Sequence, residues 1–68
     1  MNQMKPNVNS IPPGMLVQIL RQHHVEYRRR DGRLWALEVI FDRDGRDVSQ
    51  WVDVTHWSMR RLLRWLGY

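Results

Sequence analysis

Apolar residues recur at helical spacing near both ends of the chain and alternate with polar residues in its middle. Near the N-terminus, Leu16, Ile19 and Leu20 form a stripe with the three- and four-residue spacing of an amphipathic helix. Two prolines stand just before this stripe, where the first helical turn tolerates them. The pattern predicts a helix over about residues 13–24.

A second helix is predicted near the C-terminal end. Its apolar stripe is formed by Met59, Leu62, Leu63 and Leu66. Thr55 is a suitable N-cap, and Gly67 stands where a C-cap glycine is common. Arginines fill the positions opposite the stripe, so we expect this helix to bury one face and expose a basic one.

The middle of the chain predicts a three-stranded antiparallel meander. The pair Asp-Gly occurs at residues 31–32 and 44–45, each time between segments of alternating polarity. This pair favours tight turns because glycine tolerates a positive φ. The expected strands cover about residues 25–30, 33–41 and 46–54.

The second turn predicts a pairing register. If Asp44-Gly45 is a two-residue turn, Leu37 faces Val52 and Trp35 faces Val54. The side chains that point inward are then Trp35, Leu37, Val39, Phe41, Val48, Val52 and Val54. Because this set is apolar and only Gln50 is out of place on the inward side, the register is self-consistent.

The first turn is expected to differ from the second. A two-residue turn there would point charged side chains inward, so we predict a three-residue loop with Gly32 as a G1 bulge. Val25 then faces Leu37, and Tyr27 faces Trp35, on the core side.

The expected fold class is α+β, with the order α-β-β-β-α and a three-stranded antiparallel meander packed against two helices. If both helices cover the inward set, the outer face carries Glu26, Arg28, Leu34, Ala36, Glu38, Ile40, Ser49, Trp51 and Asp53. An exposed apolar patch of this kind indicates an interaction site. Three alternatives could cover this face. They are another molecule, a second copy of the chain, or one of the two helices if it lies on the outer side.

The charge of the chain indicates the kind of partner. Eleven basic residues stand against seven acidic ones, for a net charge of +4. All but one of the basic residues are arginines, whose planar fork suits phosphate and guanine edges. A basic domain is one mark of nucleic-acid binding, although the same charge also serves solubility.

Three basic or aromatic surfaces are candidates for nucleic-acid contact. They are the first hairpin tip, the outer sheet face and the exposed side of the C-terminal helix. Their residues are Arg28, Arg29, Arg30, Arg33, Trp51, Trp57, Arg60, Arg61 and Arg64. Arginine beside an aromatic ring can bind a phosphate backbone and stack on a base. The alternative for each surface is a charged face that only contacts solvent.

Other functional classes find little support in the residues. The chain has no cysteine, and His23 and His24 are neighbours on a helix, about 100° apart, so no metal site or cofactor is expected. No nucleophile elbow or glycine-rich phosphate loop is present, so we do not expect an enzyme. No apolar run approaches the roughly 20 residues of a membrane span, and the polar residues 1–10 predict a disordered tail before a single domain at 11–68, in the cytoplasm.

The α-β-β-β-α order resembles that of double-stranded-RNA-binding domains and of the toxin family that shares their fold. The three-stranded sheet followed by a helix resembles AP2-type DNA-binding domains and the arm-binding domains of phage integrases. Residues 27–30, 35–39 and Trp51 are similar to the AP2-type pattern. That likeness implies arginine and tryptophan side chains on the sheet that contact the major groove. The lysine-rich helix start of the RNA-binding domains is absent, so the likeness is one of topology and assigns no family.

The sequence therefore predicts a small basic accessory protein that binds nucleic acid, with DNA as the expected form, and of the kind that phages and plasmids encode. The alternative is a protein-interaction module, either a homodimer or a small inhibitor of a host protein. It would use the apolar outer sheet face through Leu34, Ile40 and Trp51.

Overall fold

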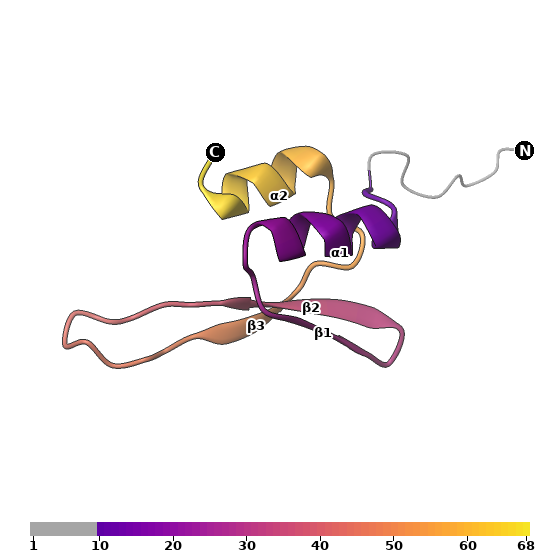
Figure 1. Ribbon diagram of the computed structural model, residues 1–68. Coiled ribbons are helices and arrows are strands. Elements are labelled where there is room, and N and C mark those ends of the chain that lie inside the picture. Colours follow the sequence, from indigo (N-terminus) through magenta and orange to yellow (C-terminus); the bar gives the residue numbers. More distant parts are fainter. Residues whose placement is uncertain (1–9) are drawn as a thin grey trace, which may run out of the picture.

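The sheet and both helices follow the predicted order along the chain. The computed structural model describes residues 10–68. Its elements are helix α1 (Pro13–Gln22), strands β1 (Tyr27–Arg30), β2 (Arg33–Glu38) and β3 (Gln50–Asp53), and helix α2 (Met59–Leu66). The strands form one antiparallel sheet in the order β1-β2-β3, and both helices lie on the same face of it (Figure 1). The predicted α+β class and the α-β-β-β-α order are confirmed.

The helices and the sheet share one apolar core. Both predicted helical stripes contribute to its centre, where Leu16, Leu20 and Leu62 are buried. The strands and connecting segments add Ile11, Leu34, Ala36, Val54 and Trp57. A chain of about 60 residues buries only about 60% of its unfolded surface, so each side chain of this small core matters for stability.

The predicted tail mostly lies outside the described residues. The disordered tail was predicted over residues 1–10, and residues 1–9 lie outside the described residues. Ser10 forms an isolated β-bridge with Ser58. The next N–H, that of Ile11, donates to the carbonyl of Trp57 at 2.9 Å. Ser10 therefore belongs with the domain and not with the tail.

Helix α1 ends two residues earlier than predicted. His24 takes a left-handed conformation, with φ of +58°. Its N–H donates to the carbonyl of Arg21 at 3.1 Å, and the N–H of Val25 donates to that of Leu20 at 2.9 Å. These two bonds form a Schellman motif, which satisfies the last helical carbonyls and turns the chain toward β1.

Ser58, and not Thr55, is the N-cap of α2. The Oγ of Ser58 accepts the N–H of Arg61 at 3.2 Å. Gly67 ends the helix as predicted, with φ of +101°. Thr55 instead closes the end of the sheet, where its Oγ1 accepts the N–H of Leu34 at 2.8 Å. The prediction for Thr55 was wrong because its hydroxyl finds a backbone donor on a strand that is distant in sequence.

The first hairpin has a tighter turn than predicted. Arg30 pairs with Arg33, so Asp31 and Gly32 alone form the turn. Their φ values are +53° and +74°, as a type I′ turn requires at both central positions. The predicted three-residue loop with a G1 bulge is therefore wrong.

The second hairpin carries the three-residue loop. The N–H of Asp42 donates to the carbonyl of Arg46 at 2.9 Å, and Gly45 has φ of +82°. The Oδ1 of Asp42 also accepts the N–H groups of Asp44 and Arg46, both at 2.9 Å. This carboxylate favours the longer loop because it satisfies two backbone donors inside it. The predicted two-residue turn at residues 44–45 is wrong.

These two turns reverse the faces of strand β2. Leu34 and Ala36 point toward the helices and are buried, whereas Trp35 and Leu37 lie on the outer face. The prediction had placed them the other way round. This segment is apolar on both faces, so its pattern cannot choose a side, and a shift of one residue in register exchanges the two faces. In β3 the predicted direction holds, and the following Val54 is buried.

The second hairpin continues beyond the regular ladder as an arm, which we define as residues 39–49. The arm extends away from both helices (Figure 1). Regular pairing stops at its base because the hydroxyl of Ser49 accepts the N–H of Ile40 at 3.0 Å, in place of a backbone carbonyl. The strands expected over 33–41 and 46–54 are shorter for this reason.

Three predicted core residues lie on the arm and are exposed to solvent. The exposed fractions are 62% for Val39, 61% for Phe41 and 47% for Val48. The helices do not extend over this part of the hairpin (Figure 1). The prediction that these side chains point into the core was wrong for two reasons. Val39 and Phe41 continue the outer face that Trp35 and Leu37 occupy, because the register of β2 is reversed. Val48, opposite Ile40, is on the helix side of the sheet but lies on the arm, which the helices do not cover.

Candidate nucleic-acid interface

The first candidate surface is the outer face of the sheet. Arg28 lies opposite Trp35 across β1 and β2, and Trp51 lies opposite Leu37 across β2 and β3. The guanidinium carbon of Arg28 stands 4.1 Å from the ring centroid of Trp51. Together with Arg30, these side chains line a shallow hollow of about 210 Å³. The sheet thus presents an arginine stacked on an indole beside a second exposed arginine.

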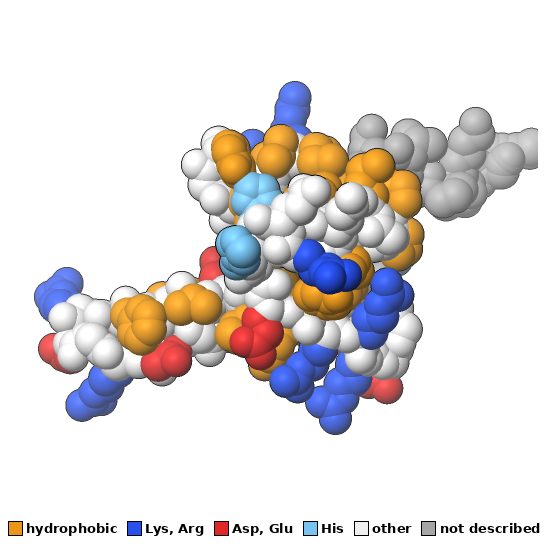
Figure 2. All heavy atoms as spheres, in the orientation of Figure 1, with side chains coloured by type: hydrophobic (Ala, Val, Ile, Leu, Met, Phe, Trp, Pro, Cys, Tyr) orange, Lys and Arg blue, Asp and Glu red, His pale blue; other side chains and the backbone are white. Residues whose placement is uncertain are grey.

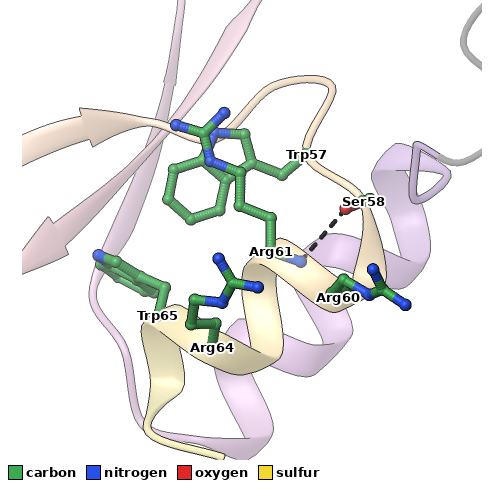
Figure 3. Close-up of a pocket in the computed structure, with 6 residues that line it drawn as sticks. All are labelled: Trp57, Ser58, Arg60, Arg61, Arg64 and Trp65. Carbon is green, nitrogen blue, oxygen red and sulfur yellow. Dashed lines mark hydrogen bonds between the residues drawn. The ribbon is translucent and has the colours of Figure 1, made fainter.

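The second candidate surface lies along helix α2. An open pocket of about 400 Å³ is lined by Trp57, Ser58, Arg60, Arg61, Arg64 and Trp65. The guanidinium carbon of Arg61 is 4.3 Å from the ring centroid of Trp57. In Figure 3 the side chain of Arg64 reaches toward the space between the two indoles, while Arg60 points away from them. The pocket therefore joins a cationic rim to an aromatic wall.

The local fold holds this second pocket in place. The Ser58 cap fixes the first turn of α2 and with it the backbone of Arg61. Trp57 is 9% exposed and meets Trp65 edge to face, with ring centroids 5.8 Å apart. Such edge-to-face contact fixes the angle between two rings. The Nε1 of Trp65 is buried without a hydrogen-bond partner among the described residues, and burial of such a donor costs about 1–3 kcal/mol.

The arginines of both surfaces are largely free of acidic partners. Within residues 10–68, the only ion pair joins Arg33 to Asp53, at 2.9 Å. Figure 2 shows basic side chains gathered around the β1–β2 end of the sheet, while the arm at the opposite end carries acidic and basic side chains together. Unpaired guanidinium groups keep their hydrogen-bond donors available for a polyanion.

Asp53 orders the end of the sheet beside the first surface. Its Oδ1 accepts the hydroxyl and the N–H of Thr55, and its Oδ2 accepts a bond from Arg33. The hydroxyl of Thr55 is the main cause of a lowered pKa at Asp53, followed by the N–H of the same residue, and Arg33 adds to the effect. Arg33 is thus held at the rim of the outer face and is less free than Arg28.

The lowered pKa of Asp53 predicts a contribution to stability that acid removes. A carboxyl group whose pKa falls on folding stabilises the fold above its ordinary value of 3.8 and loses this effect as the pH drops through the lower folded value. We expect Asp53→Asn to destabilise the domain by about 1 kcal/mol at neutral pH, the usual net value of one hydrogen bond.

The measurement is urea unfolding at a series of pH values. The difference between the natural chain and the variant should shrink as the pH falls below 3.8. A difference that stays constant from neutral to strongly acidic pH would show that the carboxylate does not contribute in this way.

The predicted site residues fall on three separate places. Arg28, Arg30 and Trp51 share the outer face, with Arg33 at its rim. The pocket of α2 is lined by Trp57, Arg60, Arg61 and Arg64. Trp57 was predicted on the exposed side of this helix, but it is buried in the core. Arg29 alternates to the other side of β1, where it is exposed and lies opposite Leu34.

The predicted protein-contact surface changes with the register. It cannot use Leu34, which is only 6% exposed beneath the helices. Ile40 is half-buried at the base of the arm, and Trp51 is half-buried on the outer face. The expected apolar patch of these three residues does not exist as one exposed surface.

Two tryptophans of the candidate surfaces were not among the predicted site residues. Trp35 had been placed in the core, but the outer-face hollow includes it. The Asp-Gly pair at residues 31–32 could have placed Trp35 correctly. A two-residue turn there pairs Arg28 with Trp35 and puts both side chains on the outer face. Trp65 lies at the border of the α2 stripe, so spacing alone could not assign it to either side.

Comparison with known protein families, curated proteins and solved structures finds no match to this chain. Within residues 10–68, neither helix has the length and apolar character that crossing a membrane would require.

Proposed function

We propose that this protein binds nucleic acid, with duplex DNA as its main form. The observation that supports this most directly is the presence of two guanidinium–indole pairs, Arg28 with Trp51 and Arg61 with Trp57. In each pair the arginine has no carboxylate partner among the described residues. An arginine held over an aromatic ring loses less freedom when its fork binds a phosphate or a base edge.

The shape of the outer face suits a groove of duplex DNA. Three neighbouring strands span about 10 Å between the outer two, and the major groove is about 12 Å wide. Arg28 and Arg30 project from β1 on the same face as Trp35 and Trp51. In this arrangement the arginines meet phosphates or guanine edges, and the indoles contact apolar groups such as thymine methyls.

The pocket of α2 supplies a second set of contacts. Arg61 and Arg64 border a space that is open to solvent and walled by Trp57 and Trp65. Guanidinium groups around an aromatic wall bind backbone phosphates and stack on unpaired bases. This set extends the charged surface beyond the sheet, which raises the number of phosphates that one molecule can neutralise.

The test is a titration of the full chain against a fluorescently labelled DNA duplex, followed by anisotropy at several salt concentrations. Binding should weaken steeply with salt, because each neutralised phosphate contributes about 0.9 to the logarithmic salt slope. A single-stranded oligonucleotide of the same sequence reports which form is preferred.

Absence of binding even at low salt would overturn the proposal. It would favour the alternative of a protein partner for the outer face, where Trp51 lies half-buried. The salt titration is therefore the measurement that separates the two functions.

A further inference from the structure

The arm carries apolar side chains that the rest of the domain does not cover. Val39, Phe41 and Val48 are all exposed by about half or more. Figure 2 shows apolar side chains along the arm, between the domain and a charged tip. A projecting hairpin with such a band gains stability when another surface covers it.

The arm also has an open strand edge. The N–H of Leu37 donates to the carbonyl of Glu26 at 2.8 Å, the last such bond between the β1 segment and β2. Because hydrogen bonding alternates along a strand, the backbone groups of Val39 and Phe41 point toward the same, now empty, side. No backbone partner for either occurs among the described residues. This short edge is available to a further strand.

A groove lies at the base of the arm, where the ends of both helices approach the sheet. Its volume is about 500 Å³. The apolar residues Val25, Leu37 and Ile40 and the acidic residues Glu26 and Glu38 are among those that line it. The carboxylate of Glu38 accepts a hydrogen bond from the Nε2 of Gln50 at 2.9 Å, whereas Glu26 has no ion-pair partner among the described residues. Within a chain of net charge +4, Glu26 is therefore the acidic group of the groove that a cation can reach.

The tip of the arm offers groups that complement this groove. The carboxylate of Asp42 is occupied by two N–H groups of its own loop, and that of Asp47 by the N–H of Ser49 at 2.8 Å. The guanidinium groups of Arg43 and Arg46 have no ion-pair partner among residues 10–68. The tip therefore directs the donors of Arg43 and Arg46 outward, beside the carboxylate of Asp44.

We propose that two copies of this chain associate through their arms, side by side and antiparallel. A two-fold axis between the arms brings the tip of each copy to the base of the other. Phe41 and Val39 then pack on their counterparts, and the open edges pair. Arg43 of one copy reaches Glu26 of the other. The tip lies about five residues from the groove, or about 17 Å of extended chain. Because both arms have this length, the tip of each reaches the groove of the other when the arms lie antiparallel.

The test is sedimentation equilibrium of the full chain, without nucleic acid, over a wide range of protein concentration. The natural chain should approach twice its mass of 8.3 kDa as the concentration rises. Phe41→Asp should raise the dimer dissociation constant about 30-fold or more, the loss typical of a central aromatic residue in an interface. Met15→Asp is the matched control, because Met15 is similarly exposed but lies on α1.

A charge exchange tests the register of the two arms. Arg43→Glu and Glu26→Arg should each weaken the dimer, and the double variant should restore it, since the opposite charges then meet again. These substitutions change exposed side chains, and circular dichroism checks that each variant is folded.

The proposal is overturned if the natural chain stays monomeric at the highest soluble concentration. It is also overturned if Phe41→Asp leaves the dimer intact, or if the double charge exchange fails to restore what the single changes weaken. Because no DNA is present, none of these results depends on whether the protein binds nucleic acid.

Discussion

The double variant Arg28→Ala/Arg61→Ala should bind duplex DNA at least about tenfold more weakly than the natural chain. The change removes one guanidinium from each of the two arginine–tryptophan pairs. A charge-assisted hydrogen bond contributes about 1.5 kcal/mol or more. If both groups contact phosphates, the logarithmic salt slope should also fall by about 1.8, or about 0.9 for each contact. Anisotropy titrations at several salt concentrations measure both quantities.

The matched control for this experiment is Arg21→Ala/Arg46→Ala. It removes the same two charges, but Arg21 lies on α1 and Arg46 on the arm, away from both candidate surfaces. The control should keep most of the affinity and the salt slope. The two variants are compared at protein concentrations where their molar mass is equal. Equal losses in both would mean that only the net charge matters, and the assigned surfaces would then be wrong.

Leu62→Ala should cost about 2–5 kcal/mol of unfolding free energy, the range for large-to-small changes in a packed core. Leu62 is fully buried in the cluster formed by α1, α2 and the sheet. A domain of this size rarely has more than about 5 kcal/mol in total. The variant should therefore be largely unfolded or close to it, since the cavity cannot be filled by so few neighbours.

Urea unfolding followed by tryptophan fluorescence and circular dichroism measures this effect. The control is Met59→Ala on the same helix, because Met59 is 38% exposed and its removal leaves a much smaller cavity. The control should lose well under half as much stability as Leu62→Ala. Similar losses in the two variants would mean that α2 does not pack as described.

The helices illustrate what local signals can predict. The C-cap of α2 at Gly67 is confirmed. Of the predicted stripe, Leu62 is buried, whereas Met59 at its start is exposed. The N-cap was misplaced because two hydroxyl residues, Thr55 and Ser58, stand before the helix. Only the position of the Leu34 N–H decides which of them is needed elsewhere.

The candidate surfaces were predictable in part. Arg28 beside Trp51 follows from the alternation of β1 and β3, which the prediction had right, and their contact at 4.1 Å is observed. Trp35 was missed because strand β2 was turned over. Its neighbours Leu34 and Ala36 are both apolar, so the burial of either face would satisfy the pattern.

The number and order of the elements, the positions of both turns and the basic character of the chain follow from the amino-acid sequence alone. They depend on short-range periodicity, turn chemistry and counting. The direction of β2 and the exposure of Val39 and Phe41 depend instead on tertiary structure. Each of the two hairpin loops differs by one residue from its predicted length, which turns β2 over. In addition, the helices do not reach over the arm. A strand that is apolar on both sides has no local feature that decides which side is buried. Backbone donors and covering helices that are distant in sequence decide it instead.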